Sequence, residues 1–197
     1  MLKIFTMALG AYQTNCYLVW QEGRKDCLVI DPGYEAQTIA AQAEKRGLEI
    51  AGVLLTHGHF DHVGAVRELV MDRDIPVYLN AKDTAMPPQM TAGPLYYTDT
   101  YEDTLTLAGI PFRVIPTPGH TPGSVCLLAE NHLFSGDTLF RGSCGRTDLP
   151  GGSWQEMQAS LKKLTALPPD TRVYPGHGAA SLLADELEYN PYLKGAL

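Results

Sequence analysis

The sequence predicts a layered α/β protein with a mixed β-sheet, and three observations support this fold class. Short apolar runs typical of strands alternate with amphipathic helical patterns along the chain. In the middle of the chain, strand-like runs follow one another closely, as they do in hairpins. With 197 residues, 45% of them hydrophobic, the chain is long enough to bury a full core. No linker interrupts this pattern, so we expect one domain over residues 1–197.

The first half of the chain is expected to alternate strands and helices. The N-terminal stretch predicts a first β-strand and its turn, because it lacks the continuous apolar segment of a secretory signal. Residues 35–47 predict a helix in which Ile39 and Ala43 share one face and Gly47 ends the helix. Residues 62–74 predict a second helix with an apolar side. Strands are expected at residues 27–33, 52–59 and 75–80.

The second half predicts four strands and two helices. Residues 153–167 give the clearest helix, with Ser153 as N-cap and Glu156 at the capping-box position. Residues 181–189 predict the final helix. Strands are expected at residues 111–117, 124–130, 132–137 and 172–177.

The segment at residues 83–101 shows neither a helical nor a strand period. It contains three prolines, two methionines and three tyrosines. Two interpretations are open: a packed surface excursion, or a loop beside a substrate site.

Composition limits the classes of function. The chain has 22 acidic and 15 basic residues and a net charge of −7, which argues against a nucleic-acid or anionic-membrane partner. No apolar run approaches the length of a membrane span. The four cysteines show no C-x-x-C pairing, which predicts reduced thiols in a cytoplasmic protein.

The stretch THGHFDHVG, residues 56–64, places three histidines and an aspartate within six positions. The run GVLLTHGH that contains it has the same plan as three later runs, RVIPTPGH, HLFSGD and RVYPGH: a short apolar strand, a glycine, then histidine or aspartate. Glycine allows a sharp turn and a close approach of the backbone. If the four strands share a sheet, one edge of it would collect these side chains. The candidate ligands are His57, His59, Asp61, His62, His120, Asp137 and His177.

This residue set points to a catalytic metal centre. Neutral imidazole and carboxylate suit zinc, iron or manganese, and five of the six histidines belong to the set. A structural zinc ion needs only four ligands, so the surplus favours catalysis. Two divalent ions that share a carboxylate would use all seven residues. We expect two zinc ions, with iron or manganese as alternatives.

At these residues the chain resembles the metallo-β-lactamase superfamily, whose H-x-H-x-D-H motif is matched by residues 57–62. The residues at 120, 137 and 177 match its three later ligands. The resemblance implies a four-layer αβ/βα sandwich with two mixed β-sheets and the metals at one edge of them. It also implies two ligand sets and one bridging carboxylate: His57, His59 and His120; Asp61, His62 and His177; and Asp137.

Within the superfamily the chain is most similar to the glyoxalase II-type hydrolases, in FSGDTLFRGSCGRTDLPGG (134–152) and EYNPYL (188–193). This resemblance implies that a metal-bound hydroxide cleaves a small anionic acyl thioester, such as S-lactoylglutathione, and that Asp61 orients the hydroxide. Arg146 stands where these proteins have a basic residue that contacts glutathione, but Asp148 replaces the usual tyrosine. The chain also ends before the separate C-terminal helical domain that grips glutathione in full-length members, so we expect none here.

Two further side chains are candidates with two interpretations each. Arg141, like Arg146, is a cation beside the expected site and would bind a substrate carboxylate, or it is an ordinary loop charge. Asp31, at the end of strand 27–33, would orient a ligand histidine through its second ring nitrogen, or it is a turn carboxylate.

Two other activities stay open. The loop GSCGRTD is also similar to that of the persulfide dioxygenases, a resemblance that implies a single iron held by His57, His120 and Asp137. The residues of the second site are present in that family too but bind no metal there, so the set of ligands does not separate the two activities. The superfamily also includes metallonucleases and phosphodiesterases, which the acidic charge disfavours.

Overall fold

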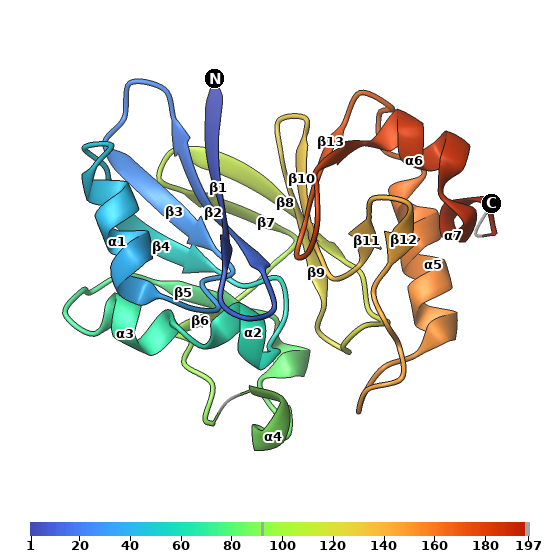
Figure 1. The fold of residues 1–197 in the computed structure, drawn as a ribbon, viewed down its shortest axis with the longest axis horizontal. Coiled ribbons are helices and arrows are strands. Elements are labelled where there is room, and N and C mark those ends of the chain that lie inside the picture. Colours follow the sequence, from blue (N-terminus) through green and yellow to red (C-terminus); the bar gives the residue numbers. More distant parts are fainter. Residues whose placement is uncertain (92, 196–197) are drawn as a thin grey trace.

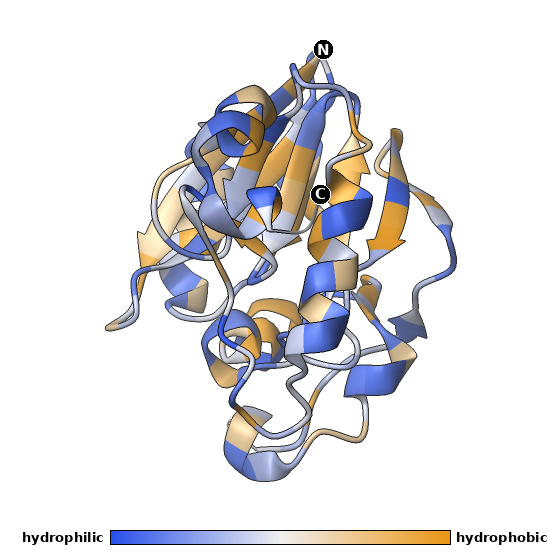
Figure 2. Cartoon of the chain, turned by 90° about the vertical axis from the view of Figure 1, so that its right-hand side faces the viewer, coloured by the Kyte–Doolittle hydropathy of each residue, from blue (hydrophilic) through white to orange (hydrophobic). Residues whose placement is uncertain are grey.

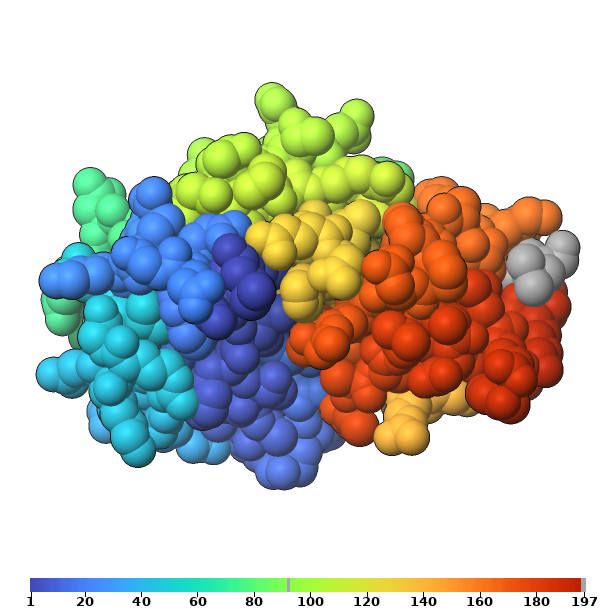
Figure 3. Space-filling model, turned by 90° about the horizontal axis from the view of Figure 1, so that it is seen from above, coloured from blue at the N-terminus to red at the C-terminus, as the bar shows by residue number. Residues whose placement is uncertain are grey.

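Two six-stranded β-sheets form the two inner layers of the molecule, and helices cover their outer faces. A computed structural model describes residues 1–91 and 93–195. The four layers lie in the order helix, sheet, sheet, helix (Figure 1). Seen from above, the N-terminal part of the chain (blue to cyan) and the C-terminal part (orange to red) lie side by side (Figure 3).

The first sheet has the strand order β1-β2-β3-β4-β5-β6. Its first three strands pair antiparallel, and the pairs from β3 to β6 are parallel, so the sheet is mixed. Its strands are β1 (Leu2–Leu9), β2 (Thr14–Gln21), β3 (Asp26–Ile30), β4 (Glu49–Leu54), β5 (Val77–Leu79) and β6 (Asp99–Thr100).

The second sheet has the order β14-β13-β10-β9-β8-β7 and is also mixed, because only β10 and β13 are parallel. Its strands are β7 (Thr104–Leu107), β8 (Ile110–Pro116), β9 (Val125–Ala129), β10 (His132–Gly136), β13 (Arg172–Pro175) and β14 (Ser181–Leu182). A separate hairpin consists of β11 (Leu139–Phe140) and β12 (Ser143–Cys144).

The helices bury one apolar face each against a sheet. In α5 (Trp154–Leu164), Met157, Leu161 and Leu164 are buried and the polar face is turned outward (Figure 2). Its N-cap Ser153 accepts a hydrogen bond from the backbone N–H of Glu156, at 3.3 Å. The other helices are α1 (Ala36–Glu44), α2 (Phe60–Val63), α3 (Val66–Val70), α4 (Pro88–Thr91), α6 (Leu183–Tyr189), α7 (Pro191–Lys194) and the 3₁₀ helix η1 (Ala81–Asp83).

Three hydrophobic clusters hold the layers together. The first joins α1 and α3 to the outer face of the first sheet, as Ile39 and Leu69 do. The second lies between the two sheets and is centred on side chains such as Phe134. The third joins α5, α6 and α7 to the second sheet. The four-layer sandwich with two mixed sheets that the sequence predicted is therefore confirmed.

One sequence-based expectation was wrong. The helix expected at 62–74 is divided into α2 and α3, because the N–H of Ala65 donates to the carbonyl of Pro32 instead of continuing the helix. The four ligand-bearing strands are divided between the two sheets: β4 lies in the first sheet, whereas β8, β10 and β13 lie in the second. Across residues 1–91 and 93–195, no helix has the length and apolar character needed to cross a membrane.

Candidate metal centre

Four loops meet where the two sheets come together, at the ends of β4, β8, β10 and β13. These loops are residues 56–62, 117–124, 136–137 and 176–177. Backbone hydrogen bonds join these connections. The N–H of Val125 donates to the carbonyl of Thr56 at 2.9 Å, which links the two sheets. The N–H of Gly176 donates to Gly136 at 2.8 Å, and Asn15 donates to Gly176 at 2.7 Å. The loops therefore lie on a fixed backbone framework.

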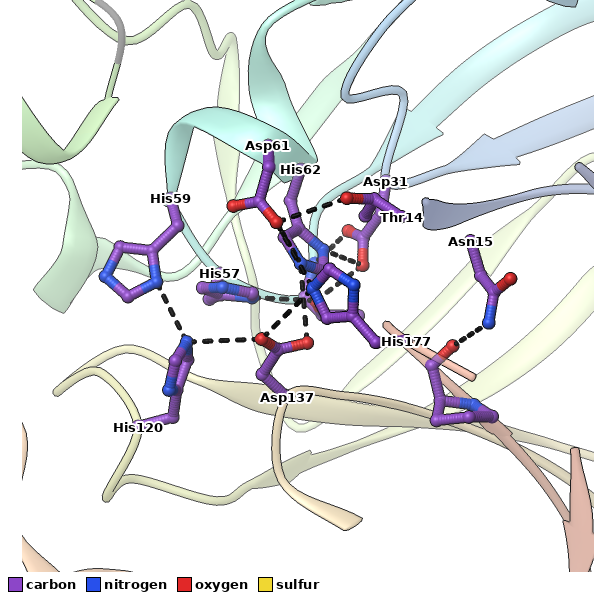
Figure 4. Close-up of polar contacts among 12 residues, drawn as sticks. Thr14, Asn15, Asp31, His57, His59, Asp61, His62, His120, Asp137 and His177 are labelled. Atoms are coloured by element: carbon purple, nitrogen blue, oxygen red, sulfur yellow. Dashed lines mark hydrogen bonds and ion pairs between the residues drawn. The ribbon is translucent and has the colours of Figure 1, made fainter. Parts of the chain in front are cut away.

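One ligand group contains only imidazoles. His57, His59 and His120 place one nitrogen each within 4.8 Å of one another. The closest pair is Nδ1 of His59 and Nε2 of His120, at 2.8 Å (Figure 4). All three rings are buried. We call His57, His59 and His120 the imidazole group.

The second ligand group contains a carboxylate. Asp61, His62 and His177 also place their ligand atoms within 4.8 Å of one another. Oδ2 of Asp61 lies 3.2 Å from Nε2 of His177 and 3.6 Å from Nε2 of His62. We call Asp61, His62 and His177 the mixed group.

Asp137 lies between the two groups. Its carboxylate oxygens are 3.4 Å from Nε2 of His62, 3.4 Å from Nε2 of His120 and 3.5 Å from Nε2 of His177 (Figure 4). The glycine before His177 is required here, because a β-carbon on Gly176 would collide with Oδ1 of Asp137. Asp137 thus has the position that a shared ligand needs.

The second ring nitrogen of four histidines is held by a protein oxygen, which fixes the ring orientation. These contacts pair Nδ1 of His57 with the hydroxyl of Thr56 (3.1 Å), His62 with the carboxylate of Asp31 (2.9 Å), His120 with the carbonyl of Arg146 (2.7 Å) and His177 with the carbonyl of Tyr12 (3.3 Å).

The residues fit a bound cation. Within the described chain, Nε2 of His57, Nε2 of His62 and Oδ1 of Asp137 are buried and have no hydrogen-bond partner. Unsatisfied buried polar atoms are costly and rare in folded proteins. Each of these atoms belongs to a group in which three ligand atoms converge. The His and Asp cluster is therefore a metal-binding site by its chemistry.

The imidazole group favours neutral rings. Burial and the neighbouring histidines lower the pKa of His57 well below its ordinary value. Burial and His120 lower the pKa of His59 to about 4. Because metals bind unprotonated imidazole, these two rings are ready to bind at neutral pH.

The mixed group favours protonated rings in the absence of a metal. Burial opposes the charge on His62, but Asp137 and Asp31 outweigh it and raise its pKa well above the ordinary value. Burial likewise opposes the charge on His177, yet Asp61 and Asp137 raise its pKa. Burial alone would raise the pKa of Asp137, but His62 and the other histidines lower it.

Comparison with known protein families identifies the superfamily of this chain. The family model described as the metallo-beta-lactamase superfamily matches residues 9–177. The chain belongs to the metallo-beta-lactamase superfamily. All seven converging His and Asp side chains lie within the matched residues.

Two of the relatives are named hydroxyacylglutathione hydrolases. A hydroxyacylglutathione hydrolase, GloC, from Haemophilus influenzae is 33% identical over 98% of this chain and 98% of its own length. A hydroxyacylglutathione hydrolase from Alkalilimnicola ehrlichii is 42% identical over 87% of this chain and 64% of its own length.

Several solved structures match nearly the whole chain, among them the following three. The BLEG-1 B3 metallo-beta-lactamase has a TM-score of 0.89 at 38% identity and covers 99% of this chain and 100% of its own. TTHA1623 in a di-iron-bound form has a TM-score of 0.86 at 42% identity, over 95% of this chain and 99% of its own. ETHE1 from Myxococcus xanthus has a TM-score of 0.84 at 27% identity, over 98% of this chain and 85% of its own.

Asp31 lies beside the mixed group of this superfamily member. Its backbone is in the left-handed region, at φ 51°, which is unusual for a residue other than glycine. The buried carboxylate accepts hydrogen bonds from the N–H and the hydroxyl of Thr56, at 2.8 and 2.7 Å, and contacts Nδ1 of His62. The strained backbone thus aims this carboxylate at a ligand histidine.

The two arginines lie on the surface near the centre. Arg146 is 61% exposed, and its guanidinium makes a bidentate ion pair with Asp148, with both hydrogen bonds at 2.7 Å. This ion pair lowers the pKa of Asp148 to about 2. Arg141 lies in the turn of the β11–β12 hairpin, next to Phe140, whose ring is 6.1 Å from that of His177.

Two contacts around the centre were not anticipated from the sequence. The hydroxyl of Thr14 donates to Oδ2 of Asp61 at 3.1 Å, and Asp83 contacts the loops of both His59 and His120. Asp83 comes soon after a predicted strand, as several of the candidate ligands do. No glycine followed by histidine or aspartate marks it, so the sequence did not single it out. The segment 83–101 lies beside the centre, since Met86 and Leu95 approach Gly58; residue 92 lies outside the described residues.

Proposed function

We propose that this chain is a metal-dependent hydrolase of acyl thioesters, with S-lactoylglutathione as the model substrate. The observation that carries the proposal is a complete second ligand group beside the first, with Asp137 within 3.5 Å of histidines from both. Two ions sharing one carboxylate are typical of hydrolytic centres. The hydroxyacylglutathione hydrolases at 33% and 42% identity support the substrate class.

We assign the ligands as the imidazole group for one ion and the mixed group for the other, with Asp137 shared. Zinc suits these nitrogen and oxygen donors, and iron or manganese would also fit. The di-iron form of TTHA1623 supports iron as an alternative. Bound divalent ions would supply Lewis-acid activation of water and of the thioester carbonyl.

Asp61 is the side chain that we assign to the attacking water. Its Oδ2 is engaged by Thr14 and lies next to His177, which fixes the carboxylate plane. Its Oδ1 is then directed away from these partners and can accept a hydrogen bond from water. Surrounding residues also lower the pKa of Asp61 against the opposing effect of burial, which keeps it an acceptor at neutral pH. The thiolate of the substrate is a good leaving group and needs little proton donation.

We further propose that Arg146 and Arg141 bind an anionic part of the substrate. The carbonyl of Arg146 accepts a hydrogen bond from His120, so its backbone is one contact away from a ligand. The ion pair with Asp148 must open before the guanidinium can bind a substrate carboxylate. We place the protein in the cytoplasm, since its four cysteines, all in the described chain, carry free thiols.

A second candidate is iron-dependent persulfide dioxygenase activity. The similarity of the loop GSCGRTD and the likeness to the ETHE1 structure support it. In that case His57, His120 and Asp137 would hold a single iron, and Nε2 of His120 and Oδ2 of Asp137 do lie 3.4 Å apart. The mixed group would then carry no metal.

Metal analysis and paired assays distinguish the two activities. Purified protein is analysed for bound metals and tested for S-lactoylglutathione cleavage, for oxygen uptake with glutathione persulfide, and for β-lactam cleavage because of the likeness to BLEG-1. We expect two ions and thioester cleavage. One iron with oxygen uptake and no hydrolysis would refute the proposal. His177→Ala sharpens the test, because it should remove one ion and abolish hydrolysis but should leave a single-iron oxygenase largely active.

A further inference from the structure

Asp83 is a buried carboxylate that belongs to neither ligand group. It ends η1, directly after β5, and no part of its surface is exposed to solvent. The N–H of Lys82 donates to the side chain of Asn80, at 3.0 Å, which caps η1 and fixes the start of this turn. A buried carboxylate is costly unless hydrogen bonds compensate it, so its contacts indicate its role.

The two carboxylate oxygens of Asp83 bind two different metal-bearing loops. Oδ2 accepts hydrogen bonds from the N–H of Gly58 at 2.9 Å and from the hydroxyl of Thr121 at 2.8 Å. Oδ1 accepts one from the N–H of Gly123 at 2.6 Å. Gly58 lies between His57 and His59, and Thr121 directly follows His120. One side chain therefore connects the two loops that carry the imidazole group.

The backbone around Asp83 leaves space for this connection. A β-carbon on Gly123 would lie 2.6 Å from Cγ of Asp83, and one on Gly58 would lie 2.8 Å from the sulfur of Met86. Real β-carbons do not approach other atoms so closely, so glycine at both positions lets the loops pack on Asp83 and on the segment that follows it.

The mixed group is held differently. Its side chains are anchored by Asp31, by the hydroxyl of Thr14 and by the carbonyl of Tyr12, and none of these three anchors contacts Asp83 in the described chain. A change at Asp83 should therefore affect one group and not the other.

We propose that Asp83 is a positioning residue that sets the separation of His59 and His120, and so determines how tightly the imidazole group binds its metal ion. This inference needs the metal site but not the thioester substrate. Residues that orient metal ligands from outside typically contribute about 10- to 100-fold to metal affinity.

The test replaces Asp83 with asparagine, which keeps the volume but turns one acceptor oxygen into a donor. That NH₂ group must face an N–H or hydroxyl donor, so at least one loop loses its bond. Affinity for Zn²⁺ is measured by competition with a chelator in two backgrounds. In His177→Ala the remaining ion occupies the imidazole group, and in His59→Ala it occupies the mixed group. We expect Asp83→Asn to weaken Zn²⁺ binding about 10- to 100-fold in the first background and less than twofold in the second.

The matched control is Asn190→Asp, the inverse isosteric exchange in another buried clamp. The side chain of Asn190 donates to the carbonyls of Phe140 (3.2 Å) and Ser143 (3.0 Å) and to Glu186 (2.8 Å), and it contacts none of the loops that carry the imidazole group. We expect it to lower the melting temperature of the metal-free protein without changing Zn²⁺ affinity in either background.

Three outcomes would overturn the inference. The first is an affinity within twofold of the parent for Asp83→Asn in His177→Ala. The second is an equal loss in both backgrounds. If Asp83→Asn does not fold, Thr121→Val removes only one of the three bonds and serves instead. For Thr121→Val, a smaller loss of Zn²⁺ affinity confined to the imidazole group would support the role of Asp83. The third overturning outcome is an unchanged Zn²⁺ affinity of the imidazole group in Thr121→Val. No assay uses a thioester, so a failure of the proposed hydrolysis would not affect the result.

Discussion

The two halves of the metal centre contain similar ligands but hold them in opposite electrostatic states. In the imidazole group, burial and neighbouring rings lower the pKa of His57 and His59. In the mixed group, nearby carboxylates raise the pKa of His62 and His177. The anchors differ too, since Asp31 contacts the ring of His62 directly, whereas the hydrogen bonds of Asp83 go to the loops and to no ligand ring. Occupancy of the mixed group should therefore respond to pH, and that occupancy separates hydrolysis from single-iron oxidation.

The largest effect is expected from His57→Ala, because this ring contributes to two sets of converging ligand atoms. His57 takes part in the imidazole group and also in a third convergent set with His62 and Asp137. Its loss should reduce turnover about a thousandfold or more, since metal activation contributes several kcal/mol to the transition state. Thioester cleavage and metal content are measured together.

The control for this variant is a measurement that shows whether its fold is intact. The far-UV circular dichroism of metal-free His57→Ala should match that of the metal-free parent. Turnover at the parent rate, with the metal content unchanged, would rule out a mechanism that depends on the imidazole group.

A smaller effect is expected from pH. Metal binding requires unprotonated imidazole, and protonation competes most strongly where the pKa is raised. As pH falls below the raised pKa values of His62 and His177, two protons compete for the mixed group, and its affinity should fall by up to about 100-fold per pH unit. His59, with a pKa of about 4, should still be unprotonated at pH 6.

Chelator competition between pH 8 and pH 5.5 checks this difference between the groups. The affinity of the ion in the mixed group should fall more steeply than that of the ion in the imidazole group, because the pKa values of His62 and His177 are raised whereas those of His57 and His59 are lowered. His177→Ala, which lacks a full mixed group, should show only the shallow dependence. Equal slopes for both ions would contradict the electrostatic difference between the groups.

Much of the fold and the ligand cluster could be predicted from the sequence because both depend on local patterns. Apolar runs gave the main strands, and a glycine before four of the seven candidate ligands marked where each strand gives way to a ligand-bearing loop. The division of the ligand strands between two sheets could not be predicted, since pairing of β4 with β3 and β5 depends on contacts distant in sequence. The roles of Asp31 and Asp83 depend on the same long-range packing.

The break between α2 and α3 shows the physical limit of such prediction. The apolar period of residues 62–74 is helical throughout, but Gly64 packs against the carbonyl of Gly33, and Ala65 donates to Pro32. The bond from Ala65 replaces one helical bond and ends α2 at this point, and Asp61 and His62 on α2 point into the centre. Here the functional site overrides the local preference of the chain.

The smallest effect is expected at Arg146, and it tests whether recognition of an anionic substrate lies outside both ligand groups. Arg146→Ala should raise KM for S-lactoylglutathione about two- to fivefold and leave kcat unchanged, since exposed charge pairs contribute little. Asp148→Asn should act in the opposite direction, because it releases the guanidinium from its bidentate ion pair. A thioester without a carboxylate is the control, and neither variant should change its KM. If Arg146→Ala leaves KM for the anionic substrate unchanged while Asp148→Asn also has no effect, the proposed binding role of Arg146 is wrong, and the specificity must depend on groups closer to the ligands, such as Arg141 beside Phe140.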